Sequence, residues 1–216
     1  MKLLKKELAL SLSILTPLFL SFTVMAFIPG YPILVGAFFV CFGIFHSFQS
    51  ARESEDILYS ALLPIAKRDV VTAKFTVTVF FQLAALCLFA VFTVLRMTVL
   101  SDVKPYVRNV MMNANIAFLG YVLLVFAAFN VIFLRGFFKT AYYFGKPFVS
   151  FIVAASLIIG IAETVHHFPT MKYLNDLTAS SAAKQIPLLL ISAAMYVICT
   201  YLSLKSSQKR FEMIDL

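Results

Sequence analysis

Residues 52–95 contain the contrast that decides the fold. The polar stretch RESEDILYSALLPIAKRDVVTAK (52–74) is followed directly by the apolar run FTVTVFFQLAALCLFAVFTVL (75–95). This run has the length of about 20 residues that an α-helix needs to cross a hydrocarbon core ~30 Å thick. The whole chain is 62% hydrophobic and 13% charged, whereas soluble domains have about 45–50% apolar and about 25% charged residues. The sequence therefore predicts a protein that is solvated by lipid.

Five further runs have a similar apolar character. The six predicted spans are approximately 8–28, 31–50, 75–95, 114–134, 147–165 and 186–204. Strands of a membrane barrel would alternate apolar and polar residues over segments of ~10 positions, and these runs are continuous instead. We therefore predict an all-α polytopic membrane protein with six transmembrane helices, in which residues 1–216 form a single domain.

The distribution of lysine and arginine predicts the orientation, because cytoplasmic loops of membrane proteins retain these residues. If the N-terminus is inside, the inner segments hold 13 of the 18 lysines and arginines and the outer segments hold 5. We therefore predict that both termini and the polar stretch 52–74 are cytoplasmic. The same bias accounts for the net charge of +8, so we expect membrane lipids and not nucleic acid as the neighbours of the positive charge.

The cluster Glu163-x-x-His166-His167 is the pattern that most resembles a chemical site. A glutamate and a histidine three residues apart share one face of a helix, and two such pairs bind two metal ions in some four-helix proteins. This chain has a single copy and no HExxH motif. Two interpretations stay open, a polar helix end at the membrane interface and an intramembrane metal-dependent hydrolase. We favour the first and predict no catalytic, cofactor-binding or metal-binding residue.

Two features of the remaining sequence bear on energy use and on packing. There is no G-x-x-x-x-G-K-[ST] motif, which is the glycine-rich loop that binds the phosphates of ATP. Any ATP used must therefore be bound by a partner. Gln82, Asn115 and Asn130 lie within or beside apolar runs, and we interpret them as residues that join helices by hydrogen bonds.

The polar stretch 52–74 has an internal order that a plain solvated loop does not need. Ile57, Leu58, Ala61, Leu62 and Ile65 recur near helical spacing, after an acidic cluster and before a basic pair. Acidic residues at the start of a helix and basic residues at its end suit the helix dipole. We therefore predict a short amphipathic helix between the second and third spans.

This stretch also resembles a known family. The pattern is Leu63-Pro64-Ile65-Ala66-Lys67-Arg68-Asp69-Val70-Val71-Thr72-Ala73-Lys74-Phe75, with acidic residues upstream. It is similar to the loop between the second and third of six spans in ABC-2 type permease subunits of bacterial ABC exporters. Small six-span permeases, such as those of the phenol-soluble-modulin exporters, are similar in size and layout.

The resemblance implies a function. The chain would be the permease subunit of an exporter in a bacterial plasma membrane, moving an amphipathic peptide, a lipid-like compound or a drug outward. It would not be an enzyme itself, because two copies of a cytoplasmic ATPase subunit would hydrolyse ATP. A second permease, expected as a homodimer, would complete the membrane part. A membrane protein for immunity or regulation that transports nothing is a further interpretation.

The resemblance also assigns the helix within 52–74 as the coupling helix, which lies in a groove of the ATPase. Its apolar contacts and polar rim suit an interface, which needs an apolar anchor and charges that fix the register. The predicted ATPase-coupling residues are Glu53, Glu55, Asp56, Leu58, Leu62, Leu63, Pro64, Lys67, Arg68 and Lys74.

Overall fold

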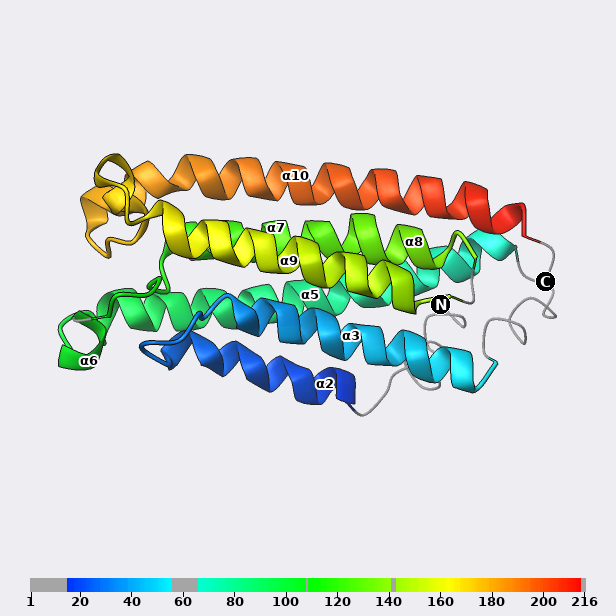
Figure 1. Cartoon of the computed structure of the whole chain (residues 1–216), viewed down its shortest axis with the longest axis horizontal. Helices are drawn as coiled ribbons and strands as arrows, with labels where there is room; N and C mark the ends of the chain where they lie inside the picture. The colour runs from blue at the N-terminus through cyan, green and yellow to red at the C-terminus, as the bar shows by residue number, and fades with distance from the viewer. Residues whose placement is uncertain (1–14, 56–65, 108, 141–142, 215–216) are drawn as a thin grey trace.

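The chain folds into a bundle of long helices that lie side by side (Figure 1). The computed structural model describes residues 15–55, 66–107, 109–140 and 143–214, and within these ranges every regular element is a helix. The elements are α2 (Leu15–Phe19), η2 (Leu20–Phe27), α3 (Val35–Glu53), α5 (Lys67–Thr98), α6 (Lys104–Val107), α7 (Ile116–Ala128), η3 (Phe129–Leu134), α8 (Arg135–Phe137), α9 (Gly145–Val165), η4 (Pro169–Leu174) and α10 (Ala179–Glu212). The prediction of an all-α fold is confirmed for these residues.

Four helices of the described chain are long and apolar enough to cross a membrane. They are α5, the continuous helix Ile116–Phe137, α9 and α10. A shorter apolar helix covers Leu15–Phe27, and α3 lies along the bundle with these helices (Figure 1). The start of the predicted first span at residue 8 lies outside the described residues. Six membrane crossings and the orientation of the termini stay predictions.

Two helices are longer than the spans predicted from apolar residues. The third predicted span starts at 75, but α5 starts at Lys67, and the last predicted span is 186–204, but α10 covers Ala179–Glu212. Lysine, arginine, glutamate and glutamine favour a helix almost as much as alanine does. A helix can therefore continue into water past the point where its apolar residues end.

The helix Ile116–Phe137 forms the centre of the bundle. Of its most apolar window, 67% is buried, compared with 17% for α10. It packs against α10, α5 and α9, and it is hydrophobic on all sides, as expected for a buried helix. Between α7 and α8 it contains the π-helix η3, in which one turn holds an extra residue. Such π segments inside α-helices are rare and are frequent at functional sites.

Two glycines allow α3 to pack closely against α2 and η2. A Cβ atom on Gly36 would lie 2.8 Å from the backbone oxygen of Phe22, and one on Gly43 would overlap the side chain of Phe19. The Thr16 hydroxyl donates to the Gly43 carbonyl oxygen at 2.9 Å. Small residues at helix interfaces in membranes allow such short approaches, so α2, η2 and α3 form one close-packed unit.

The two ends of the bundle differ in composition. We call one end the basic end, where α3 and α10 finish and α5 and α9 begin (right in Figure 1). Its cations include Lys67, Arg68, Lys139, Lys146 and Lys209. We call the other the amide end, where α7 and α10 begin and α5 and α9 finish (left in Figure 1). It is defined by the buried or half-buried amides Asn113, Asn115, Asn175 and Gln185.

Candidate functional site

At the basic end, the first turns of α5 contact the last turns of α10. Lys67 Nζ donates to the Ile214 carbonyl oxygen at 2.6 Å, and Arg68 Nε donates to Glu212 Oε1 at 2.9 Å. One turn further, Gln208 Nε2 donates to Thr72 Oγ1 at 2.9 Å. The Arg68 and Glu212 side chains are 59% and 41% exposed, and an exposed ion pair adds at most about 1 kcal/mol of stability. These bonds therefore join the two helix ends, and the exposed ion pair among them adds little to the stability of the fold.

The end of α3 lies on the other side of the polar stretch. Glu53 is the last residue of α3 and accepts a hydrogen bond from Gln49 Nε2 at 3.3 Å. Glu55 has a φ of 52°, the left-handed conformation in which many helices end, usually at a glycine. The side chains of Glu53 and Glu55 are both exposed, so the polar stretch begins with two carboxylates in water.

The structure therefore describes part of the predicted coupling set. Glu53, Glu55, Lys67 and Arg68 lie at the basic end, on the two helix ends that border 56–65. The predicted amphipathic helix falls on 56–65, so Asp56, Leu58, Leu62, Leu63 and Pro64 lie outside the described residues. The basic pair is not a separate surface element, because it forms the first turn of α5.

Lys74 differs from the rest of the predicted coupling set. Its side chain is 4% exposed, and its Nζ lies over the Phe48 ring, 5.9 Å from the ring centre. A cation over an aromatic face is stabilised by the ring electrons. Lys74 therefore lies between α5 and α3 and joins these helices, away from the exposed surface.

A buried network of polar side chains lies halfway along the bundle. Gln82 Nε2 donates to Asn130 Oδ1 at 2.9 Å, and Asn130 Nδ2 donates to Gln82 Oε1 at 3.1 Å and to Thr200 Oγ1 at 2.9 Å. The Tyr196 hydroxyl donates to Gln82 Oε1 at 2.8 Å. The network joins α5, η3 and α10, and Asn130 belongs to the π segment. The two amides stand out in the sequence, but a hydroxyl side chain within an apolar run is a weak signal, so sequence reasoning missed Tyr196 and Thr200.

An apolar groove opens beside this network. Its volume is about 580 Å³ and it runs between α5 and α10, with Leu123 of α7 in its lining. Tyr196 and Thr200 take part in both the network and the groove. The remaining lining residues are Phe75, Thr76, Val79, Leu83, Leu86, Ala193, Val197, Tyr201 and Leu204. The groove offers a mostly apolar surface with the hydroxyl-bearing side chains of Thr76, Tyr196, Thr200 and Tyr201.

At the amide end, hydrogen bonds join three connections of the chain. Asn115 caps α7 by accepting from Phe118 N at 3.0 Å, and its Nδ2 donates to the Leu174 carbonyl oxygen at 2.8 Å. Gln185 Oε1 accepts from Ala117 N at 3.2 Å, and its Nε2 donates to the Tyr173 carbonyl oxygen at 2.6 Å. Both amides are fully buried, and buried polar groups are stable when their hydrogen bonds are made.

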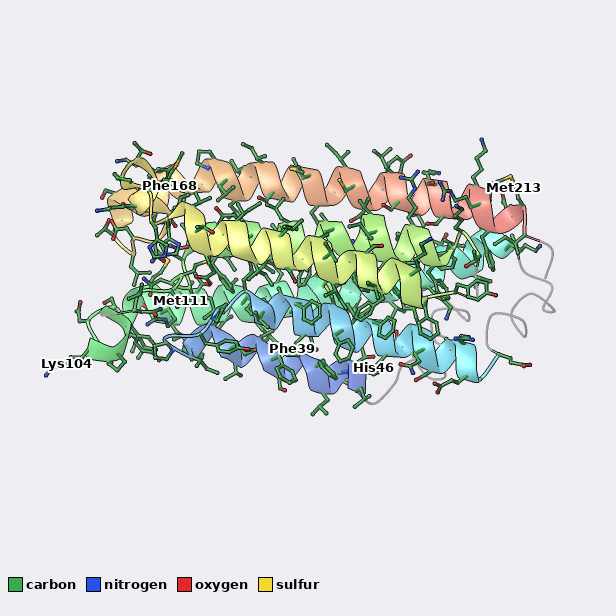
Figure 2. All side chains as sticks on the ribbon, viewed as in Figure 1. Phe39, His46, Lys104, Met111, Phe168 and Met213 are labelled. Atoms are coloured by element: carbon green, nitrogen blue, oxygen red, sulfur yellow. The ribbon has the colours of Figure 1, made fainter. Side chains whose placement is uncertain are left out.

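Glu163, His166 and His167 also lie at the amide end, close to Met111 and Phe168, which Figure 2 labels. Glu163 Oε2 accepts from Met112 N at 2.9 Å. Both ring nitrogens of His166 lie 3.3 Å from carbonyl oxygens, and the rings of His166 and His167 are 4.2 Å apart. Among the described residues, no group of three His, Cys, Asp or Glu side chains is placed to hold a metal ion. The geometry favours the interpretation as a polar helix end.

Asp176 precedes α10 at the same end and stabilises its start. Its carboxylate accepts from the hydroxyls of Ser181 and Thr178, both at 2.7 Å, and from Thr178 N at 3.2 Å. The Ser181 hydrogen bond, followed by those of Thr178, holds the pKa of the carboxyl below its usual value. A negative charge at the start of a helix is also favoured by the helix dipole.

Comparison with known families decides the identity. A family model described as "ABC-2 family transporter protein" matches residues 1–212. The chain belongs to the ABC-2 transporter family. No curated protein and no solved structure gives a match.

Membership places this ABC-2 chain among multi-pass membrane proteins that act as transport permeases. Permeases of the family generally work with a cytoplasmic ATPase subunit.

Proposed function

We propose that this chain is the permease subunit of an ATP-driven exporter, and that a separate ATPase subunit drives it through the segment 53–68 at the basic end. The contact between the ends of α5 and α10 is the observation that supports this most. Segment 56–65 is followed directly by Ala66 and by Lys67 and Arg68, which bond to Ile214 and Glu212. A push on this segment would displace the ends of α5 and α10 together.

The path from the basic end continues along α10. This helix contacts α5 through Gln208, joins the buried network through Tyr196 and Thr200, and reaches the amide end at Gln185. A displacement at the basic end therefore acts on the network and on the groove beside it. This continuity supports a role for 53–68 in coupling, with Lys74 as the buried residue that joins the moving end of α5 to α3.

The charge of the two ends supports the orientation. Most of the described lysines and arginines lie at the basic end, and the positive residues of membrane proteins are retained in the cytoplasm. We therefore place the basic end in the cytoplasm, where an ATPase is accessible. Outward movement of substrate, a bacterial plasma membrane and a homodimer of permeases with two ATPase subunits complete the proposal.

The groove between α5 and α10 supports an amphipathic or hydrophobic substrate. Its lining is mostly apolar and includes four hydroxyl-bearing residues, Thr76, Tyr196, Thr200 and Tyr201, which suits a molecule that has a long apolar face and a few polar groups. Binding sites for such molecules are mostly apolar with a few placed polar groups. A peptide helix, a lipid-like compound and an apolar drug share this chemistry. No described observation favours a metal-dependent hydrolase.

Co-purification with the ATPase subunit of the proposed exporter, expressed together with this chain, tests the coupling assignment. We expect the double variant Leu62→Asp and Arg68→Glu to abolish association and the substrate-stimulated ATP hydrolysis. The matched control is Lys205→Glu with Lys209→Glu. These two substitutions also change the charge of the basic end, but at exposed positions of α10. The control should retain association. If the Leu62 and Arg68 variant still binds the ATPase, the coupling assignment is wrong.

A charge exchange separates two roles of Arg68. In Arg68→Glu with Glu212→Arg, the ion pair between α5 and α10 can form with reversed charges, but the charge offered to the ATPase is inverted. We expect this variant to fold normally and to stay defective in ATPase association. Full recovery would mean that Arg68 acts only by holding α10, and would contradict a direct contact with the ATPase.

A further inference from the structure

A second pocket lies at the basic end, where α8 finishes and α9 begins. Its volume is about 590 Å³. The lining residues are Ile132, Gly136, Lys139, Thr140, Tyr143, Gly145, Lys146, Pro147 and Ser150. The groove between α5 and α10 shares none of these residues, and the predicted coupling set contains none of them. The proposed transport function therefore leaves this pocket unexplained.

The pocket has a positive rim. Lys139 and Lys146 both line it with exposed side chains, and none of its described lining residues is acidic. Thr140 Oγ1 accepts from Tyr143 N at 3.2 Å, which leaves the hydroxyl hydrogen of Thr140 as a further donor. A phosphate carries oxygen acceptors and negative charge, and lysine is an ordinary ligand for it. The rim suits a phosphate group.

The inner wall of the pocket is apolar and depends on one glycine. Ile132 and Pro147 line it, and a Cβ atom on Gly136 would lie 2.8 Å from Cβ of Pro147. A side chain at 136 would therefore push α8 and α9 apart and change the shape of the pocket. The polar rim and the apolar wall give the pocket the two-part character of a phospholipid.

An apolar stripe continues from the pocket along α9. Lys146, Val149, Val153 and Leu157 follow one another at spacings of three or four residues, which places them on one face of the helix. The three apolar side chains are 60%, 57% and 63% exposed. The stripe therefore extends from the lysine rim toward the middle of the bundle, along the path that an acyl chain takes below its headgroup.

We propose that the pocket formed by Lys139, Lys146 and the start of α9 binds the phosphate headgroup of an anionic glycerophospholipid, with an acyl chain along Val149, Val153 and Leu157. The stripe favours a lipid over a soluble phosphate, because one lipid molecule would contact both the lysine rim and the apolar face that begins beside it, whereas a soluble ion would contact the rim alone. With the basic end in the cytoplasm, the pocket lies at the inner leaflet, whose anionic lipids attract basic residues. Basic pockets between membrane helices on this side bind such headgroups.

A tryptophan reporter tests the proposal without ATPase or substrate, so its failure is distinguishable from failure of the transport function. The chain contains no tryptophan, so Tyr143→Trp places a single fluorophore in the lining of the pocket. The variant is reconstituted in phosphatidylcholine vesicles that contain brominated phosphatidylglycerol or, at equal mole fraction, brominated phosphatidylcholine. The reference reporter is Phe80→Trp, at a position on α5 that is 59% exposed.

At the Tyr143→Trp reporter, we expect the brominated anionic lipid to quench with an apparent affinity about tenfold higher than that of brominated phosphatidylcholine. At the Phe80→Trp reporter, we expect the two brominated lipids to quench equally. Lys139→Gln with Lys146→Gln should remove the preference, whereas the charge-matched pair Lys205→Gln with Lys209→Gln should keep it. Equal quenching by both lipids at Tyr143→Trp would overturn the proposal. Selective quenching that inorganic phosphate abolishes would also overturn it, because the site would then take a soluble anion.

Discussion

Hydrogen bonds hold the amide end together, whereas aromatic rings fill the interior of the half that leads to the basic end. Asn115 and Gln185 bond to backbone groups of segments far apart in the chain. In the other half, the Phe133 ring lies 5.3–5.5 Å from the rings of Phe45 and Phe48, and Phe45 stacks on Phe148 at 3.8 Å.

The amide end and the phenylalanine-rich half differ in how far their residues can move without losing their contacts. A hydrogen bond weakens steeply when its angle or length changes, so the buried hydrogen bonds of the amide end favour one arrangement more strongly than the exposed bonds of the basic end do. Ring packing tolerates several geometries, both stacked and edge-on, so the phenylalanine cluster can repack as helices shift. We therefore expect the amide end to act as the fixed end and the basic end, where the proposed ATPase contact lies, to move.

The largest expected effect comes from opening a cavity in the phenylalanine cluster. Phe133 is fully buried, and Phe133→Ala should lower the free energy of unfolding by about 3 kcal/mol, because a cavity forfeits contacts that lipid does not replace. Unfolding in mixed micelles with increasing dodecyl sulfate measures it. The control Phe80→Ala, on the lipid-facing side of α5, should cost little. Equal losses for the two variants would contradict a packed core at Phe133.

Gln185→Met tests the fixed end. The substitution removes the acceptor for Ala117 N and the donor to Tyr173, so we expect a loss of about 1–3 kcal/mol, because buried backbone groups are left unpaired. Amide hydrogen exchange should become faster in 169–178 and stay unchanged near Phe133. The control Lys184→Met changes an exposed neighbour on the same helix. Faster exchange at both ends of the bundle would show that the ends are not independent.

The buried network should contribute less stability than either end. Asn130→Leu should cost up to about 1.7 kcal/mol, since hydrogen bonds between membrane helices contribute about 0.6 kcal/mol on average and about 1.7 kcal/mol at most. A double-mutant cycle with Gln82→Leu isolates the pair, and coupling near zero would show that the two side chains act separately. If the network transmits movement from α10, Asn130→Leu should lower substrate-stimulated ATP hydrolysis by more than the loss of folded protein accounts for.

The smallest expected effect is a pH dependence at the amide end. The pKa of Asp176 is lowered in the folded chain by its hydrogen bonds to Ser181 and Thr178. Its contribution to stability is therefore complete above the pKa of the unfolded chain, about 3.9, and is lost as the pH falls through the lower folded value. We expect less than ~1 kcal/mol, because the carboxylate is partly exposed and solvent screens it. Asp176→Asn should flatten the dependence of unfolding free energy on pH below about pH 4. If the slope of unfolding free energy against pH stayed the same in Asp176→Asn, Asp176 would not be the source of the pH dependence.

The helical class and the family could be predicted from the sequence because both depend on local patterns. Long apolar runs and the pattern around Leu63-Pro64 can be seen without the fold. The helix ends at Lys67 and Glu212 could not be placed, because polar residues that favour helices continue α5 and α10 beyond the apolar stretch. The buried hydroxyls of Tyr196 and Thr200 could not be found either, since only the packing of α10 against η3 shows that they bond to amides.

The sequence assigns the candidate coupling site to a stretch of the chain, and this assignment stays a prediction, whereas the contacts of its described residues could not be predicted. Charge and spacing indicated that the basic pair follows a segment open to the cytoplasm. The bonds from Lys67 and Arg68 to the end of α10 join residues that are more than 140 positions apart in the chain, and no local pattern reports such a contact. The burial of Lys74 over Phe48 is likewise a property of packing.

The π segment η3 has a consequence for the direction in which side chains point. A π turn accommodates one residue more than an α turn, and each residue of an α-helix turns the chain by about 100°. If η3 changed to α geometry, α8 would rotate by about that angle relative to α7 without any loop having to unfold. Gly136 would leave its place against Pro147, and Asn130 would leave its place against Gln82. The π segment is therefore the place where a change of register in the central helix would move both of these contacts at once.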